Sequence, residues 1–208
     1  DIDGVLLANS FIPVILAEAA LRNNIKLVQI SSGCIFNYDH KKDSPVKEES
    51  RDYFFELFYS RSKIYADRAL EALARDYNIL IARIRIPLLN APHPKNLLNK
   101  LIKYKKVIDI PNSVTYIPDF IRAISHLINI DARGIYNVVN KGALRYPKLM
   151  RVYQKYVPSF KYTVIDFHKL GWIRTNLLMS TAKLEKSGFK VRNINSVLEE
   201  CVREYLKS

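Results

Sequence analysis

Two short apolar runs, each preceded by a segment with helical spacing, constrain the fold of this chain most. The first run is "IKLVQISS" (residues 25–32), which follows the helix-like "NSFIPVILAEAALR" (9–22). The second is "ILIARIRI" (79–86), which follows a long helical pattern over 54–77. Pro87 comes directly after this run and ends it. Apolar runs of this kind predict buried strands, and their alternation with helices predicts a parallel sheet with crossover helices.

The same pattern continues at lower regularity. "KVIDI" predicts a brief strand, "PDFIRAISHLI" (118–128) a helix with a proline at its start, and "GIYNVVN" (134–140) another strand. Residues 144–208 are mainly helical in pattern, and no internal repeat or low-complexity linker interrupts the chain. We therefore expect one compact α/β unit with a helical C-terminal cap.

Composition excludes several classes of protein. The chain has 208 residues, of which 49% are hydrophobic and 25% charged, so disordered and fibrous classes drop out. Its net charge of +13 would suit a nucleic acid, but the basic residues are spread along the sequence and no nucleic-acid-binding motif occurs. A basic protein that binds a diphosphate-bearing small molecule is the preferred interpretation.

Location and metal content follow from the same inspection. No segment suggests a membrane span or a signal peptide, which predicts a cytoplasmic protein without a membrane partner. The two cysteines, Cys34 and Cys201, are far apart and lack metal-type spacing, so we expect neither a disulfide framework nor a metal site.

The motif Tyr-x-x-x-Lys occurs twice. Tyr38 and Lys42 lie in a polar loop, where nothing fixes the two side chains together. Tyr59 and Lys63 lie on the long predicted helix, where four residues rise about 6 Å and bring both side chains to one side. An ammonium beside a phenol lowers the pKa of the phenol, which makes it a usable general acid. Ser32 closes the first strand, at the edge of the sheet where ligands bind in open α/β folds.

A serine at a strand end followed by Tyr-x-x-x-Lys on the next helix resembles the short-chain dehydrogenase/reductase superfamily, and in particular its extended branch, which acts on nucleotide sugars. Further blocks are similar, in the same order, to the 3,5-epimerase/4-reductases of nucleotide-rhamnose synthesis and, more loosely, to dTDP-4-dehydrorhamnose reductases. These blocks are "SSGCIFNYD", "FYSRSK", "RIRIP", "HPKNLLNKLIKYKKVIDIPNSVT", "RGIYNVVNKG" and "IRTNLLMSTAKL".

The resemblance implies a fold. Residues 1–140 would be the C-terminal part of a Rossmann-type domain, with a substrate-loop insertion at about 89–115. Residues 141–208 would form a substrate-binding cap. The expected fold class is therefore α/β, a partial Rossmann-like parallel sheet with crossover helices and a mostly helical cap.

The resemblance also implies an NADPH- or NADH-dependent reduction of a nucleotide-linked 4-keto-6-deoxy sugar. Tyr59 would protonate the oxygen formed when hydride reaches C4, Lys63 would tune Tyr59 and bind the nicotinamide ribose, and Ser32 would hydrogen-bond the carbonyl. Pro87, in the matching "RIRIP" block, would contact the cofactor. The nucleotide, whether UDP, dTDP or GDP, stays open.

Epimerisation at C3 and C5 needs two groups that flank the sugar ring, one to remove a proton and one to return it. Cys34 and Lys100 match the acid/base residues of epimerising family members. A cysteine after a strand is more often a packing residue, and a lysine in a lysine-rich helix is more often solvated, so their joint occurrence carries the assignment. The remaining matches are to substrate-binding positions: Arg174 and Asn176 for the nucleotide diphosphate, and Asn112 for the sugar pocket.

One family feature is absent. Extended members begin with a strand and a G-x-x-G-x-x-G turn, whose backbone amides hold the cofactor diphosphate. The chain has six glycines, and no three have that spacing. We expect the first Rossmann strands to lie outside these residues, in a preceding or separate N-terminal half. The alternative is a non-catalytic regulatory or binding subunit that has lost the dinucleotide site. Self-association into a homodimer also stays open.

Overall fold

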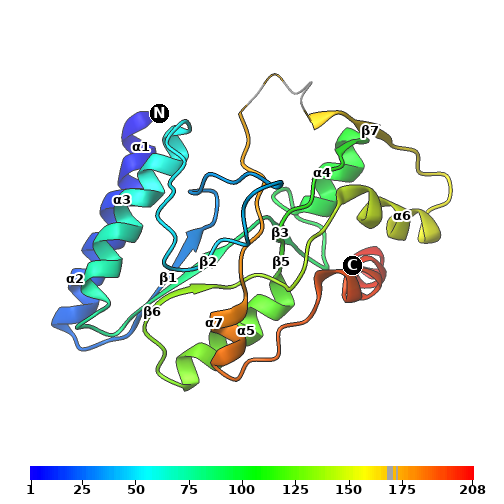
Figure 1. The fold of residues 1–208 in the computed structure, drawn as a ribbon. Helices are drawn as coiled ribbons and strands as arrows, with labels where there is room; N and C mark the ends of the chain where they lie inside the picture. The colour runs from blue at the N-terminus through cyan, green and yellow to red at the C-terminus, as the bar shows by residue number, and fades with distance from the viewer. Residues whose placement is uncertain (168–170, 172) are drawn as a thin grey trace.

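A three-stranded parallel sheet forms the centre of the computed structural model, which describes residues 1–167, 171 and 173–208 (Figure 1). The strands are β1 (Leu27–Ser32), β2 (Ile79–Ile84) and β6 (Gly134–Asn137), in the order β1-β2-β6. Leu27 lies opposite Ile79, and Leu80 lies opposite Gly134. This sheet confirms the predicted partial Rossmann-like α/β fold.

Side-chain alternation along β2 builds the two layers that cover the sheet. Ile79 and Ile81 pack toward α2 (Ile12–Arg22) and α3 (Phe58–Leu73) in one buried cluster. Leu80 and Ala82 point the other way and pack with residues of α5 (Ile117–Asn129) and α7 (Ala182–Lys186). In Figure 1 these helix pairs lie on opposite sides of the sheet. A strand that is apolar on both faces is what this arrangement requires.

The N-terminal helix begins earlier than the sequence pattern predicted. It runs through α1 (Ile2–Leu6), a π-helical turn at Leu7–Phe11 and α2. At the π-helical turn, Ser10 donates a hydrogen bond of 2.7 Å to the carbonyl of Ser62 on α3. This contact joins the two helices.

The expectation that no segment could span a membrane is wrong by the criterion of length and composition. Ile2–Arg22 forms 21 helical residues with a mean hydropathy of 1.8 in their most apolar window, of which 17% is buried. At 1.5 Å per residue this helix is about 30 Å long, which matches the hydrocarbon thickness of a bilayer. The helix is longer than predicted because residues 2–8, ahead of the expected start at residue 9, are also helical.

A second core lies beside the sheet, under the C-terminal part of the chain. It joins segments from both sides of residue 140, including Leu98, Leu149 and Leu198, all fully buried. Two short parallel ladders frame it, β3 with β5 and β4 with β7. The predicted strand in "KVIDI" is present as β4. The remaining elements around this core are β3 (Pro87–Leu88), α4 (Leu97–Tyr104), β4 (Lys106–Ile108), β5 (Thr115–Tyr116), α6 (Tyr146–Tyr156), β7 (Thr163–Ile165), a 3-10 turn at Ile194–Ser196 and α8 (Leu198–Lys207).

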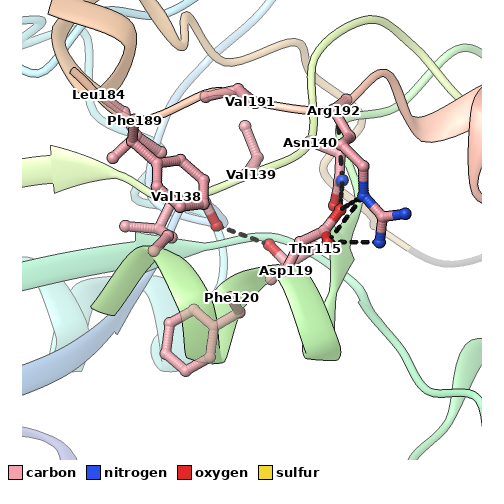
Figure 2. A pocket seen from close by; sticks show the side chains of 11 residues that line it. Thr115, Asp119, Phe120, Val138, Val139, Asn140, Leu184, Phe189, Val191 and Arg192 are labelled. Atoms are coloured by element: carbon pink, nitrogen blue, oxygen red, sulfur yellow. Dashed lines mark hydrogen bonds and ion pairs between the residues drawn. The ribbon is translucent and has the colours of Figure 1, made fainter. Parts of the chain in front are cut away.

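Arg192 connects the two cores. Its guanidinium donates to Asp119, at the start of α5, at 2.6 Å and to Glu200, on α8, at 2.7 Å. Asp119 also accepts from Asn140 at 2.6 Å, so it lies between the amide and the guanidinium (Figure 2). The adjacent hollow, lined by α5, the segment after β6, α7 and the segment before α8, holds about 10 Å³, room for roughly one water molecule. This hollow lies where the sheet packs against the C-terminal cap, and it is too small to bind a substrate.

Candidate active site

The C-terminal end of β1 turns sharply and fixes Ser32 at the edge of the sheet. Gly33 donates its backbone N–H to the carbonyl of Ile84 at 2.9 Å, which continues the pairing with β2 for one residue. The backbone N–H of Cys34 donates to the Ser32 hydroxyl oxygen at 3.1 Å. The same hydroxyl also hydrogen-bonds the side chains of Tyr59 and Cys34, so Ser32 lies between these two groups.

Helix α3 carries Tyr59 in its first turn and Lys63 one turn later. Ser60, the neighbour of Tyr59, donates to the carbonyl of Cys34 at 2.6 Å, so the start of the helix is bonded to the turn after β1. The ordered helix begins at Phe58, four residues later than predicted, because Leu57 is extended (φ −96°, ψ 130°).

A buried ion pair fixes α3 against the sheet. Arg83 of β2 donates to Asp67 of α3 at 2.9 Å, and both side chains are almost completely buried. The other oxygen of Asp67 accepts from the hydroxyl of Ser31 at 2.5 Å. Asp67 lies one turn after Lys63, so this network sets where α3 presents its reactive side chains.

One cavity of about 440 Å³, at the carboxyl ends of β1 and β2, brings most of the predicted residues together. Its volume is that of a typical small-molecule site. Seven of the predicted residues line it, with Ser32 and Cys34 from the β1 turn, Tyr59 and Lys63 from α3, and Lys100 from α4. Pro87 and Arg174 complete the set.

The cavity is strongly cationic. Lys63, Arg85, Lys95, Lys100 and Arg174 line it, and none of the described residues in its lining is an aspartate or glutamate. A concave site with charge of one sign attracts a ligand of the opposite sign. The site is therefore suited to an anionic ligand such as a diphosphate ester.

Asn112 and Asn176 lie behind the cavity and do not line it. The Asn112 amide donates to the Asn176 side chain at 2.8 Å, and its oxygen accepts from the Leu177 backbone at 3.1 Å. The oxygen of Asn112 also accepts from Arg85 at 3.1 Å. The side chains of the two asparagines thus form hydrogen bonds within the protein, and these bonds support the cavity wall. Direct contact of either asparagine with a substrate stays a prediction.

The electrostatics of Tyr59 differ from the expectation. Burial raises the pKa of Tyr59 above its ordinary value, and the charge of Cys34 raises it further, although a hydrogen bond with Ser32 acts in the opposite direction. Burial also lowers the pKa of Lys63, while Asp67 acts to raise it. The prediction that Lys63 lowers the pKa of Tyr59 below its ordinary value is wrong, because burial of the phenol raises it.

Arg85 also lines the cavity and was not predicted from the sequence. Its guanidinium donates to the sulfur of Cys34 at 2.5 Å and to the carbonyl of Thr175 at 2.8 Å. Burial acts to raise the pKa of the Cys34 thiol, but the charge of Arg85 and hydrogen bonds from Ser32, Thr175 and Arg85 outweigh it, so the pKa is lowered. A signal was available: an arginine in a run as apolar as "ILIARIRI" needs a buried partner.

The fold and the cavity define a Rossmann-type α/β protein with a serine, a tyrosine and a lysine around one site. The chain belongs to the NAD dependent epimerase/dehydratase family, whose model matches residues 2–139. This confirms the resemblance drawn from the sequence blocks.

Its relatives in sequence include two plant enzymes. The bifunctional dTDP-4-dehydrorhamnose 3,5-epimerase/dTDP-4-dehydrorhamnose reductase of Arabidopsis thaliana is 32% identical over 200 residues, which are 91% of this chain and 65% of that protein. A trifunctional UDP-glucose 4,6-dehydratase/UDP-4-keto-6-deoxy-D-glucose 3,5-epimerase/UDP-4-keto-L-rhamnose-reductase of the same plant is 30% identical over 200 residues, which are 91% of this chain and 29% of that protein.

Solved structures share the fold. A UDP-rhamnose synthase from Acanthamoeba polyphaga mimivirus superposes with a TM-score of 0.86 at 24% identity, covering 94% of this chain and 70% of that one. A dTDP-4-dehydrorhamnose reductase from Bacillus anthracis in complex with NADP superposes with a TM-score of 0.77 at 20% identity, covering 96% and 71%. The chain thus spans less than a third of the trifunctional relative and about two thirds of the others.

Proposed function

We propose that this chain carries the substrate-reducing half of an NADPH- or NADH-dependent enzyme of nucleotide-rhamnose synthesis, and that the same cavity epimerises the sugar at C3 and C5. The observation that carries the proposal is that Ser32, Tyr59, Lys63, Cys34 and Lys100 line one cationic cavity. The names of the sequence relatives, which combine 3,5-epimerase and reductase activities, support this choice of reaction.

In the reduction, the sugar ketone at C4 lies between Ser32 and Tyr59. The Ser32 hydroxyl donates a hydrogen bond to the carbonyl oxygen and polarises it. Tyr59 then gives its proton to the same oxygen as negative charge develops there. A raised pKa keeps Tyr59 protonated until that moment. The nicotinamide cofactor supplies the hydride when it is bound.

The residues present fit only one end of that cofactor. Tyr59, Lys63 and Pro87 line the cavity where a nicotinamide and its ribose would lie, and Lys63 would hold the ribose hydroxyls. The described residues include no glycine-rich turn to hold the cofactor diphosphate. We propose that the preceding or separate N-terminal half supplies it by pairing with the free edge of β1, a strand on which Ile30 is 48% exposed. An apolar, unpaired strand edge is the usual site for another strand.

The epimerisation requires the same ketone. A proton on a carbon beside a carbonyl is acidic because the resulting charge spreads onto the carbonyl oxygen, which Ser32 and Tyr59 would stabilise. Cys34 on the β1 turn and Lys100 on α4 approach the cavity from different elements, as two groups flanking a ring must do. One removes the proton and the other returns it from the opposite face.

The experiment compares the two Tyr-x-x-x-Lys pairs in the full-length protein. Reduced nicotinamide cofactor is mixed with a nucleotide-linked 4-keto-6-deoxyglucose, and cofactor oxidation is followed. Tyr59→Phe is expected to lower the rate about 100-fold or more, because the proton donor is lost. Tyr38→Phe is the matched control and should keep the wild-type rate, since its hydroxyl donates to the carbonyl of Asp43 in the polar loop. Full activity of Tyr59→Phe would refute the assignment.

The epimerase part has a separate readout. In D₂O, the wild-type product should contain deuterium at C3 and C5, and both Cys34→Ala and Lys100→Met should suppress it. The alternative of a non-catalytic regulatory subunit has no support from the relatives named above, whose names describe enzymes. Cofactor binding without any oxidation by the wild-type protein would favour that alternative.

A further inference from the structure

Arg85 is a buried positive charge without a carboxylate partner. Its residue is only 2% exposed, and it takes part in no ion pair with an aspartate or glutamate within residues 1–167, 171 and 173–208. Removing a guanidinium from water costs several kcal/mol, which a buried protein recovers only through a counter-charge and hydrogen bonds. Since arginine does not lose its proton in proteins, the counter-charge must come from another group at this place.

Arg83 provides the internal comparison. It lies two residues earlier, on β2, and is also buried. Arg83 has the Asp67 carboxylate at 2.9 Å. Of these two buried arginines, Arg83 thus has a carboxylate partner, whereas Arg85, which lines the cavity, has none among the described residues.

Among the protein groups bonded to Arg85, one can carry a counter-charge when no anionic ligand is bound. The Asn112 side-chain oxygen, the Thr175 carbonyl and the Thr175 hydroxyl are all neutral. The sulfur of Cys34, at 2.5 Å from Nη1 of Arg85, is the one acceptor among them that can carry a negative charge.

We propose that Cys34 is the counter-ion of Arg85, and that Arg85 is a positioning residue which holds Cys34 as the thiolate base that starts epimerisation. The role of Cys34 in epimerisation rests on the proposed function. The ion pair between Cys34 and Arg85 does not. In the first step the C–H bond beside the ketone breaks, the proton moves to sulfur and the electron pair moves toward the carbonyl oxygen. The Lys100 ammonium then gives a proton to the opposite face of the same carbon. Solvent restores both groups afterwards.

The surroundings of Cys34 are consistent with this direction of proton transfer. The titratable groups that face it are Tyr59 from α3 and Tyr146 from α6, and its charge raises the pKa of both phenols. Arg174 donates to the hydroxyl of Tyr146 at 3.0 Å and adds a second positive charge on that side. Two phenols and the Arg85 guanidinium act on the sulfur, and the positive charge of Arg85 favours a thiolate.

The test is the pH dependence of thiol alkylation by iodoacetamide, with each cysteine quantified by mass spectrometry. The wild-type protein should alkylate at Cys34 with a midpoint below the ordinary thiol value of about 8.5. Arg85→Met should raise that midpoint by at least about one pH unit, so alkylation at neutral pH falls about tenfold. Arg133→Met is the matched control, because Arg133 pairs with Asp131 on the surface and should leave the midpoint unchanged. Cys201, which is fully buried, reports unfolding if it reacts.

The assay needs neither substrate nor cofactor, so failure of the proposed reaction would leave its outcome intact. An unchanged midpoint in folded Arg85→Met would overturn the inference. If alkylation of Cys201 shows that Arg85→Met does not fold, the inference is tested on the wild-type protein alone. A thiolate absorbance that is present in wild type at neutral pH and absent in Cys34→Ser then supports the ion pair, and its absence overturns it.

Discussion

Replacement of Arg83 by methionine should destabilise this protein strongly. The substitution keeps an apolar chain of similar length in β2 but leaves the Asp67 carboxylate buried without its counter-charge. Asp67 would retain the Ser31 hydroxyl as a hydrogen-bond donor, which cannot compensate a full charge. Breaking a buried pair by removal of one partner costs about 3–5 kcal/mol. That is a large share of the roughly 5–15 kcal/mol by which a domain is usually stable.

The free energy of unfolding can be measured by urea denaturation followed by circular dichroism. A loss of this size would lower the melting temperature by about 6–20 °C in a chain of this length. Arg145→Met is the matched control, since Arg145 pairs with Asp109 at the surface and should cost no more than about 1 kcal/mol. The double variant Arg83→Met/Asp67→Leu should recover part of the loss because no charge is left buried. A loss below about 1 kcal/mol in Arg83→Met would show that the pair does not hold α3 as described.

Two further stability predictions follow from other contacts. Burial raises the pKa of the Cys201 thiol to about 12. This value exceeds the pKa of about 8.5 that the thiol has in the unfolded chain. The free energy of unfolding is therefore unaffected by this thiol below about pH 8.5 and falls as pH rises, by about 2 kcal/mol near pH 10. Cys201→Ala should lack this part of the pH dependence in urea titrations, and identical slopes would contradict it. Arg192→Met should cost about 1–3 kcal/mol, because the bonds from α5 to α8 are lost. Arg203→Met, which affects only the surface pair with Glu204, is its control, and equal melting temperatures would contradict the role of Arg192.

The sheet and the grouping of the candidate site residues were predictable because they depend on local patterns. Continuous apolar runs at β1 and β2 and the four-residue spacing of Tyr59 and Lys63 are visible in the sequence. The positions of Ser32, Cys34 and Lys100 around one cavity followed from the resemblance, and the structure places them there.

The electrostatics were not predictable in the same way, because they depend on contacts between distant residues. Arg85 meets Cys34 across 51 positions, and Thr175 across 90. The raised pKa of Tyr59 depends on burial by neighbours that a spacing argument does not include. Asn112 and Asn176 lie behind the cavity because their side chains bond to each other, although the two residues are 64 positions apart in the sequence.

The most direct test of the proposed active site is a double-mutant cycle on Ser32 and Tyr59, with cofactor oxidation in the full-length protein as the readout. If both hydroxyl groups act on one substrate oxygen, Ser32→Ala and Tyr59→Phe should each slow oxidation by about 100-fold. The double variant should then be much less impaired than the product of the two losses, because coupled groups are not additive. Independent, multiplying losses, or a Tyr59→Phe variant within a few-fold of wild type, would contradict a shared site.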